Sequence, residues 1–506
     1  MSIHHRHPLV REHLMPGEGD ERTLLVDDSS DGGGDLVDYE EELEARRPTK
    51  MQWFTVLVCG MGNGIDAVEV LSVSFILPAL GDEIPEDKLG YLGAAVFMGM
   101  LVGAIVAGFF ADRHGRQPVL AVAMLFNFFF MLGFSMSKGL WMMTAFRFMT
   151  GCGVGGAVPV VFSMASEVMP RSMRGAAISI VASFFMVGSI GVALLAWLVI
   201  PHGSWRLFAA LCSLPALFVA VITLLFLKES PRFLLASGRA NEATATFKRL
   251  TRQDGEAQRN IRLMPVEVVA SQGGLKEVGS PRSRASHPLQ AQGEKSHWSV
   301  VQDLFSPKLR GVTGVLCLVT SCMGFGWYGL IMWMPALFKS RHVDMCIGAK
   351  AGDSECTYQS ALFAASSCFP GNMFAVVAMD RYIPHRQMLA ASLLLGAGAG
   401  LFAVVSSSPW ELGLGYCAFN AVSTVAWNSL DVASTESFPT SMRGTSMGIL
   451  SSIGRLAATA AQLVYALPSF QPPSALPIMA SAIAMSISSL AALYLPHDPE
   501  APFQSS

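Results

Sequence analysis

Long apolar segments alternate with short polar stretches along most of this chain. About 20 consecutive apolar residues cross the roughly 30 Å hydrocarbon core of a bilayer as an α-helix. Irregular backbone is excluded from lipid, because its polar groups would lack hydrogen-bond partners there. The pattern therefore predicts an all-α membrane protein with twelve transmembrane helices. These helices are expected at about 52–80, 89–111, 118–137, 140–165, 175–200, 205–227, 309–338, 358–379, 387–406, 409–435, 443–468 and 474–495.

The polar stretches divide the chain into five parts. The first stretch contains Gly32-Gly-Gly34 and an acidic cluster from Asp38 to Glu44, a composition typical of disordered tails. A second long polar stretch separates the sixth and seventh apolar segments. We therefore expect a disordered tail, a six-helix half, a linker loop, a second six-helix half and a short tail. Their expected bounds are 1–50, 51–228, 229–308, 309–495 and 496–506.

Composition supports a membrane protein and excludes several other classes. The chain is 52% hydrophobic and only 14% charged, whereas soluble domains carry about 25% charged residues. A net charge of −3 gives no reason to expect a nucleic-acid partner. The 9 cysteines are scattered and form no Cys-x-x-Cys motif, so neither a zinc site nor a redox motif is indicated. We expect no enzymatic activity, no cofactor and no metal.

A charged turn joins the second and third apolar segments, in the stretch Gly108-Phe-Phe-Ala-Asp112-Arg113-His-Gly115-Arg116. Two helices joined by so short a turn must form a hairpin whose charged turn lies at the membrane face. Gly115 gives the turn conformational freedom. Asp112 can accept hydrogen bonds from the arginines and from helix N-terminal amides. Taken alone, the turn is equally consistent with an ordinary solvated loop.

An internal repeat points to a special role for such turns. Asp380-Arg381 again follows an apolar segment in the second half of the chain. The stretch Glu167-Val-Met-Pro-Arg-Ser-Met-Arg174-Gly recurs as Glu436-Ser-Phe-Pro-Thr-Ser-Met-Arg443-Gly, with six of nine positions identical. The two pairs of motifs have the same separation to within one residue. The sequence therefore predicts a duplicated unit of six helices.

This arrangement resembles the major facilitator superfamily. The family motif Gly-x-x-x-Asp-Arg-x-Gly-Arg-Arg/Lys stands at 108–117, with Gln117 in place of the last basic residue. In the second copy Ile383-Pro384 occupies the position of the usual Gly-Arg. The resemblance implies the major facilitator fold of two six-helix repeats, in which the repeated turns control opening. The implied gating residues are Gly108, Asp112, Arg113, Gly115, Arg116, Glu167, Arg174, Asp380, Arg381, Glu436 and Arg443.

Other stretches narrow the resemblance. Lys228-Glu-Ser-Pro-Arg-Phe233 is similar to the Pro-Glu-Ser-Pro-Arg motif of sugar porters and organic-ion transporters. Asp66-Ala-Val-Glu69-Val, Trp327-Tyr-Gly-Leu330 and Ala426-Trp-Asn-Ser-Leu-Asp-Val432 look like the synaptic vesicle glycoprotein 2 group and its related vesicle proteins. The resemblance covers roughly 50–495 and implies a vesicle, endolysosomal or plasma membrane.

Loop composition predicts the orientation in the membrane. Lys and Arg gather in the turns near 113, 171, 381 and 443 and in the central loop, so these loops and both termini are expected in the cytoplasm. Cys346 and Cys356 then lie in an outer loop, where a disulfide is permitted. The tail stretch from Asp20 to Leu24-Leu25 fits an acidic dileucine signal that sorting adaptors would read.

Charged residues inside a membrane segment are costly and are functional candidates for that reason. Asp66 and Glu69 lie three residues apart on one face of the first segment, and Arg147 lies in the fourth. Asp66 is about 21 Å from the cytoplasmic entry and Arg147 about 10 Å from the outer entry, so both fall near one level. An Asp66–Arg147 pair is geometrically allowed. Such a pair would either couple protons to transport or fix helix packing, with Glu69 as the alternative proton site.

Aromatic and polar residues gather in segments seven and ten. Trp327 and Tyr328 lie in the former, whereas Trp427, Asn428 and Asp431 lie in the latter. An aromatic ring beside an acid within a helix bundle suits a cationic or sugar-like ligand. We therefore assign these five residues to substrate binding and expect Arg455 to pair with Asp431.

Two functions compete at this point. The first is secondary active transport of a small polar or organic-ion solute by alternating access, possibly coupled to protons. The second is a vesicle membrane protein that retains the transporter fold for trafficking or regulation without net flux. The expected partners are a small-molecule substrate, the lipid bilayer and sorting adaptors, with the chain acting as a monomer.

Overall fold

The computed structural model describes residues 35–251, 261–264, 297–348, 353–379, 381–439, 442–471 and 473–495. The sorting-type stretch at Asp20, Leu24 and Leu25, the turn residue Asp380 and the tail 496–506 lie outside these residues. The assignments made for them stay predictions.

The described chain is almost entirely helical and forms two sets of long helices. The first set is α2 (Lys50–Ile76), α3 (Gly90–His114), α4 (Arg116–Met136), α5 (Leu140–Glu167), α6 (Arg174–Val199) and α7 (Trp205–Leu225). The second is α12 (Arg310–Met323) with α13 (Gly329–Ser340), α14 (Ser354–Ser366) with α15 (Cys368–Ala378), α16 (His385–Val405), α17 (Pro409–Glu436), α18 (Arg443–Tyr465) and α19 (Leu476–Ala492). Short 3-10 turns are η1 (Leu77–Ala79), η2 (Gly81–Glu83), η3 (Glu86–Lys88) and η4 (Arg171–Met173).

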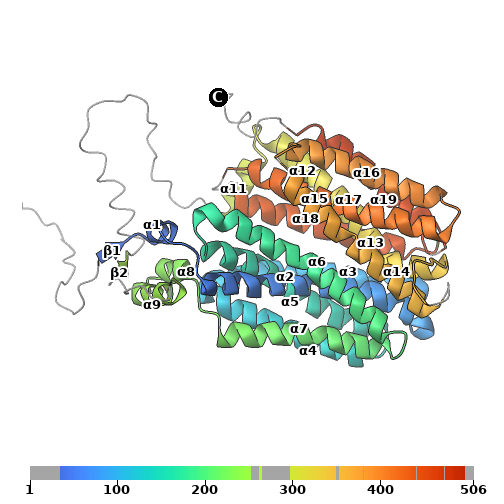
Figure 1. Ribbon diagram of the computed structural model, residues 1–506, viewed down its shortest axis with the longest axis horizontal. Helices are drawn as coiled ribbons and strands as arrows, with labels where there is room; N and C mark the ends of the chain where they lie inside the picture. The colour runs from blue at the N-terminus through green and yellow to red at the C-terminus, as the bar shows by residue number, and fades with distance from the viewer. Residues whose placement is uncertain are drawn as a thin grey trace, which may run out of the picture.

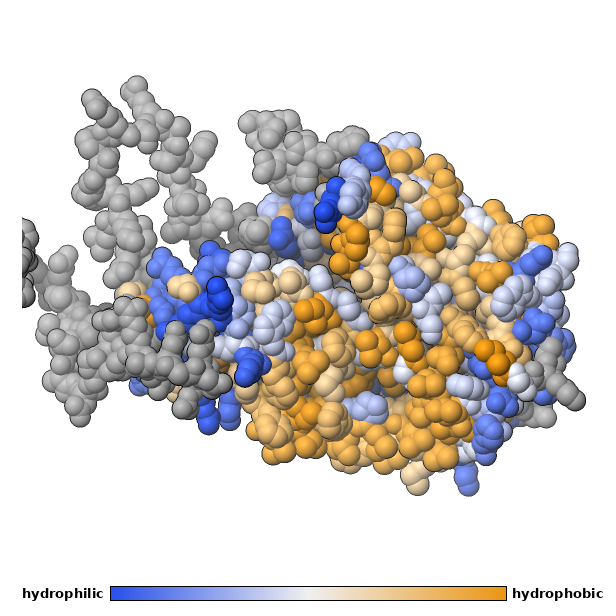
Figure 2. All heavy atoms as spheres, in the orientation of Figure 1, coloured by the Kyte–Doolittle hydropathy of each residue, from blue (hydrophilic) through white to orange (hydrophobic). Residues whose placement is uncertain are grey.

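Twelve membrane passes follow when α12–α13 and α14–α15 are each counted as one. Within the described residues, ten of these passes are long and apolar enough to cross a membrane. Helix α19 is apolar but shorter. Helix α17 is long but more polar, since it contains Asn420, Asn428 and Asp431. Figure 2 shows an apolar surface over the middle of the bundle, with hydrophilic residues gathered toward its two ends.

The two sets of helices lie side by side as two halves (Figure 1). Helix α2 packs against α13, α3 against α18, and α6 against α14 across the boundary. Within the first half, α3 and α5 approach closely because glycines face backbone. A Cβ at Gly103 would lie 2.0 Å from the carbonyl oxygen of Cys152, and one at Gly155 would lie 2.1 Å from that of Met100. Two six-helix repeats, as predicted, build the bundle.

A small folded layer covers one end of the first half. It contains β1 (Asp35–Val37), α1 (Tyr39–Glu44), α8 (Pro231–Ala236), α9 (Ala240–Leu250) and β2 (Ile261–Leu263), while α11 (His297–Leu304) leads into the second half. Strands β1 and β2 pair in parallel, with Val37 opposite Leu263. We call this end of the bundle the loop end, and the other the opposite end.

The layer corrects two predictions about domain organisation. Residues 35–50 were expected to be a disordered tail, and 229–308 a loop, but both contain folded elements. Tyr39 and Leu43 of α1 form a separate apolar core with Phe233 of α8 and Phe247 of α9, among others. Each segment buries its few apolar side chains against the other, which composition within either segment does not reveal.

Candidate functional site

A cavity of about 210 Å³ lies between the two halves. Helices α2, α5 and α6 line it from the first half, and α13, α14, α15 and α17 line it from the second, together with the turn η5 (Gly324–Tyr328) that links α12 to α13. Its polar lining residues are Asn63, Ser74, Ser189, Asn372, Asn420, Thr424, Asn428 and Asp431. A site with residues from both halves is where a two-repeat transporter binds its solute.

The turn η5 brings two aromatic residues to this cavity. It is a single turn of π-helix, a local irregularity that is frequent at functional sites. The ring centres of Trp327 and Tyr328 are 4.7 Å apart, and each lies 5.9 Å from that of Trp427 on α17. The carbonyl oxygen of Tyr328 accepts a hydrogen bond of 3.0 Å from the Gln462 amide of α18. Three aromatic residues from distant parts of the sequence therefore form one cluster.

Helix α17 places an amide and an acid beside this aromatic cluster. Asn428 donates a hydrogen bond of 2.9 Å to the side chain of Asn372. Asp431 lines the cavity, is exposed, and has no hydrogen bond or ion pair to a described residue. The indole N–H groups of Trp327 and Trp427 are buried and also have no hydrogen-bond partner there. All five residues assigned to substrate binding thus line one cavity and leave one carboxylate and two donors available.

The two halves contact each other at the opposite end. The Tyr358 hydroxyl of α14 donates a 3.1 Å hydrogen bond to the carbonyl oxygen of Phe75, and Lys339 Nζ donates one of 2.8 Å to that of Pro78. Gly90, at the start of α3, faces the backbone of Gln462, where a Cβ would lie 2.3 Å from the carbonyl oxygen. The structure is therefore closed at the opposite end.

An ion pair is buried inside the first half. Arg147 of α5 has no exposed side-chain surface, and its Nη1 lies 2.8 Å from Oε1 of Glu69 on α2, which is 2% exposed. Nη1 also donates to the Ser72 hydroxyl at 3.1 Å, and the guanidinium lies 4.0 Å from the ring centre of Phe134. The predicted Asp66–Arg147 pair is wrong, because α2 is rotated so that Glu69 and not Asp66 faces α5.

Asp66 faces the second half instead. It is 8% exposed, and its Oδ1 is buried without a hydrogen-bond partner among the described residues. Arg455 of α18 attracts Asp66 electrostatically without forming a direct ion pair with it, and its Nη1 donates a 3.1 Å hydrogen bond to the carbonyl oxygen of Met100 on α3. No ion pair joins Arg455 to Asp431, so that expected pair is also wrong. An acid of one half and an arginine of the other interact here.

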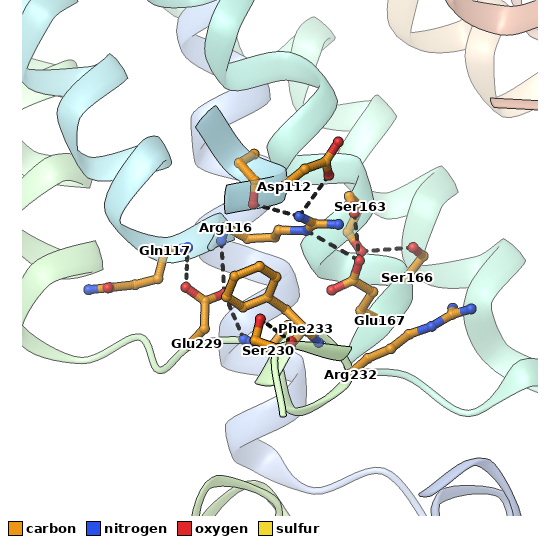
Figure 3. Close-up of polar contacts among 12 residues, drawn as sticks. Asp112, Arg116, Gln117, Ser163, Ser166, Glu167, Glu229, Ser230, Arg232 and Phe233 are labelled. Carbon is orange, nitrogen blue, oxygen red and sulfur yellow. Dashed lines mark hydrogen bonds and ion pairs between the residues drawn. The ribbon is translucent and has the colours of Figure 1, made fainter. Parts of the chain in front are cut away.

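Arg116 organises the charged turn at the loop end (Figure 3). Its Nη1 donates to the carbonyl oxygen of Ala111 at 2.6 Å and to Asp112 at 3.1 Å. Its Nε lies 3.5 Å from Oε1 of Glu167, and the guanidinium lies 5.3 Å from the ring centre of Phe233. Because Asp112 is 73% exposed, Arg116 rather than Asp112 is the centre of this cluster.

The N-terminus of α4 is capped by Glu229, a residue that sequence analysis did not assign. Its carboxylate accepts from the backbone N–H groups of Arg116 at 2.8 Å and Gln117 at 3.2 Å. Asp112 was predicted to accept from the arginines and from helix N-terminal amides; it accepts from Arg116, but these α4 amides donate to Glu229 instead. Burial raises the pKa of Glu229, although these hydrogen bonds oppose the shift. Gly115, at φ 102°, is required, because a Cβ there would lie 2.1 Å from Glu229 Oε2.

Of the other gating residues predicted in the first half, some form hydrogen bonds or ring contacts, whereas Gly108 has no close neighbour. Glu167 accepts a 2.8 Å hydrogen bond from Ser163, and Arg174 donates to the carbonyl oxygen of Met169 at 3.2 Å. Arg113 instead lies over the ring of Phe109, at 4.2 Å. Gly108 has no atom within 4 Å of an added Cβ, so no close contact explains this glycine here.

The second-half counterparts form a sparser set of contacts. Glu436 lies 3.6 Å from His385 and is 43% exposed. The Nε atom of Arg443 is buried with no hydrogen-bond partner among the described residues. Arg381 lies 5.5 Å from the ring centre of its neighbour Tyr382. The repeat therefore gives equivalent sequence positions but not equivalent contacts.

Cys346 and Cys356 are joined by a disulfide. The bond closes a short loop between α13 and α14 at the opposite end, the region that sequence analysis placed outside the cytoplasm. Met345, beside it in the chain, packs against Gly413 of α17. The disulfide thus lies next to the contact between this loop and α17.

Several residues of the site were missed in the sequence. Asn63, Asn372 and Asn420 are polar side chains within apolar segments, a signal that would have found them. Gln462 is such a residue too, and it also accepts a 3.0 Å hydrogen bond from Trp333. Glu229 is the acid of the Lys228–Phe233 motif, but the motif was used only for the family resemblance and gave this acid no role.

Comparison with known proteins identifies relatives over most of the chain. Human synaptic vesicle glycoprotein 2C is 26% identical, over 84% of this chain and 76% of that protein. Human synaptic vesicle glycoprotein 2A is 26% identical, over 90% of this chain and 79% of that protein. These relatives agree with the resemblance found in the motifs.

Solved structures and a family model agree on the fold. The partially occluded inward-open xylose transporter XylE from E. coli has a TM-score of 0.66 with 14% identity, and covers 88% of this chain and 98% of its own. The proton:xylose symporter XylE bound to 6-bromo-6-deoxy-D-glucose has a TM-score of 0.65 with 16% identity, covering 90% and 97%. These matches show that the chain shares the fold of those structures. The model of the Major Facilitator Superfamily matches residues 53–462, so the chain belongs to that superfamily.

Proposed function

We propose that this protein is a secondary active transporter that moves a small polar or organic-ion solute by alternating access. The observation that carries the proposal is the cavity between the halves, which is closed at the opposite end and lined by an aromatic cluster and an unpaired carboxylate. In a transporter of this kind, one half rocks against the other around such a central site.

The lining favours a cationic organic solute. Asp431 supplies a negative charge with no cation beside it among the described residues, and the faces of Trp327, Tyr328 and Trp427 attract cations. An unsatisfied buried donor costs about 1–3 kcal/mol, so the two indole N–H groups favour a solute that also carries an acceptor. A flat amine with one carbonyl or hydroxyl oxygen meets these requirements.

Proton coupling is proposed for the acids of α2. Asp66 has a buried oxygen without a donor and interacts with an arginine of the other half, whereas Glu69 is held by Arg147. Protonation of Asp66 would weaken its attraction to Arg455, which favours movement of the halves. Glu69 remains the alternative proton site.

The loop end is proposed to face the cytoplasm, because the arginine-rich turns lie there. A vesicle or endolysosomal membrane is proposed from the similarity to the synaptic vesicle glycoproteins. One cysteine in the central loop and another near residue 350 test the orientation in intact cells or sealed vesicles. In intact cells a membrane-impermeant thiol reagent should label only the second cysteine, and labelling of the first would reverse the assignment. In sealed vesicles, whose outer surface is the cytoplasmic face, the same reagent should label only the first.

Reconstitution in liposomes tests the transport proposal. We expect uptake of an organic cation from a screening panel, with accumulation when a proton gradient is imposed. Trp427→Ala should abolish uptake, whereas Trp410→Ala on the same helix should not, because Trp410 is 50% exposed and does not line the cavity. Saturable binding that Trp427→Ala removes, without flux of any panel member, would favour the regulatory vesicle protein instead.

A further inference from the structure

The acidic segment before the first membrane helix is bound to the arginines of a gating turn. Glu40 of α1 lies 2.6 Å from Nη2 of Arg174 and 3.1 Å from Nε of Arg171, and Arg232 of α8 lies at 3.9 Å. The backbone N–H of Ser172 lies 3.4 Å from the Glu44 carboxylate. Two acidic residues of α1 that lie one helical turn apart, Glu40 and Glu44, thus contact the turn between α5 and α6.

Buried contacts hold this segment in place beside the charges. The Tyr39 hydroxyl donates a 2.6 Å hydrogen bond to the carbonyl oxygen of Glu167, and Tyr39 is 5% exposed. Leu43, one turn later, is 2% exposed within the apolar core of the layer. Asp38 caps α1 by accepting from two backbone N–H groups. We call the segment Asp35–Glu44 the strap.

The turn that the strap binds is the one repeated in both halves. Arg174 corresponds to Arg443, and Glu167 to Glu436, in the duplicated motif. In the second half Glu436 is 43% exposed, and the buried Nε of Arg443 has no hydrogen-bond partner within the part of the chain that the structure describes. Two equivalent turns, one on each half, come together when the loop end closes around a two-fold axis. Arg174 would then meet the acid of the second half.

We propose that the strap is a brake on closure of the loop end, which holds Arg171 and Arg174 on the first half and keeps them from the second. The brake regulates the alternating access proposed above and rests on it. Its strength is set by Glu40, because this single carboxylate accepts from both arginines. Release of the strap frees Arg174 to stabilise the state in which the opposite end is open.

Glu40→Gln tests the proposal in the full chain. Spin labels at Gly175→Cys and Gly444→Cys report the distance between the two turns, and both positions have open space around an added Cβ. Labelling is done in a background without the other free cysteines. We expect Glu40→Gln to raise the population with a short distance roughly three- to tenfold, since partly exposed ion pairs are weak individually. Glu41→Gln, on the same helix but exposed and without an ion pair among the described residues, should leave the distribution unchanged.

Salt provides a second measurement. At 1 M salt, screening over about 3 Å weakens the ion pairs of Glu40 and those formed on closure alike, so the difference between the unsubstituted chain and Glu40→Gln should shrink. Distances that respond to substrate but not to Glu40→Gln would overturn the brake. A single distance under every condition, together with no flux, would overturn the transport proposal and the brake with it.

Discussion

Glu69→Gln is the substitution that most directly tests the buried ion pair. It keeps the shape of the side chain and one oxygen acceptor, but removes the charge that faces Arg147. The Arg147 side chain has no exposed surface, and its Nε and Nη2 atoms have no hydrogen-bond partner among the described residues. Among the described residues the guanidinium forms an ion pair with Glu69 alone, so no second anion compensates for the loss and we expect a large loss of stability.

The magnitude follows from the burial of the pair. Removing one partner of a buried pair costs about 3–5 kcal/mol, because the remaining charge is left in a low-dielectric interior. Arg147 would keep the Ser72 hydroxyl at 3.1 Å and the ring of Phe134 at 4.0 Å, which are polar contacts without a countercharge. We therefore expect the free energy of unfolding to fall by about 3–5 kcal/mol.

Reversible unfolding of the purified protein in detergent measures this change. The matched control is Glu83→Gln, which breaks the pair of Glu83 with Arg206 at a side-chain exposure of 42% and 36%. An exposed pair contributes only about 0–1 kcal/mol, so the control should unfold almost as the unsubstituted protein does. Adding Arg147→Gln to Glu69→Gln should recover much of the stability, because no unpaired charge remains.

A stability of Glu69→Gln within about 1 kcal/mol of the unsubstituted protein would refute the buried pair, since that is the range of the exposed control. The double variant then separates structure from coupling. A stable double variant that still concentrates substrate against its gradient assigns the pair to helix packing. One that exchanges substrate but no longer concentrates it assigns the pair to coupling.

Three further predictions concern the acid facing the second half, the charged turn and its capping acid. Asp66→Asn should abolish uphill, pH-driven uptake and preserve downhill exchange, measured in the same liposomes. Gly115→Ala should destabilise by at least about 1–2 kcal/mol through its positive φ, whereas Gly108→Ala should be near neutral in thermal unfolding. Burial raises the pKa of Glu229, so its contribution to the free energy of unfolding is full below about pH 4.3 and declines as pH rises through the folded pKa. Glu229→Gln should remove this pH dependence from the free energy of unfolding measured across pH.

The fold was predictable from the sequence because membrane insertion makes hydrophobicity decisive. The length of each apolar segment identifies the transmembrane helices, and the recurrence of Glu167 to Arg174 as Glu436 to Arg443 identifies the repeat. The cavity residues were also accessible, because Trp427, Asn428 and Asp431 are polar or amphipathic positions inside an otherwise apolar helix. Such residues are retained in a membrane only where they face a cavity or a partner.

Pairing between helices was not predictable in the same way. Asp66 and Glu69 share one helical face by spacing, and depth alone allows either acid to meet Arg147. A modest rotation of α2 decides that Glu69 faces α5 and Asp66 faces Arg455 on α18. Rotation depends on packing along the whole helix, which local spacing does not contain.

The extramembrane layer was missed for a different reason. The stretch from Asp38 to Glu44 has the charge and low hydrophobicity of a disordered tail, and two apolar residues, Tyr39 and Leu43, decide its folding. Their partners Phe233 and Phe247 lie far along the chain. A short polar segment can fold when a preformed surface supplies the rest of its core, and composition measured within the segment does not show this.

The layer also makes the two repeats physically unequal. In the first half, Glu229 caps α4, Arg116 joins Asp112 to Glu167, and Glu40 binds the next turn, so both gating turns are fixed to one folded surface. Under the alternating access proposed above, we expect the loop end to close mainly by movement of the second half toward that surface. The free energy of closure then depends on how many of these first-half charged side chains keep the ion pairs and hydrogen bonds described here. A transporter built this way can be regulated from its extramembrane side without any change in the substrate cavity.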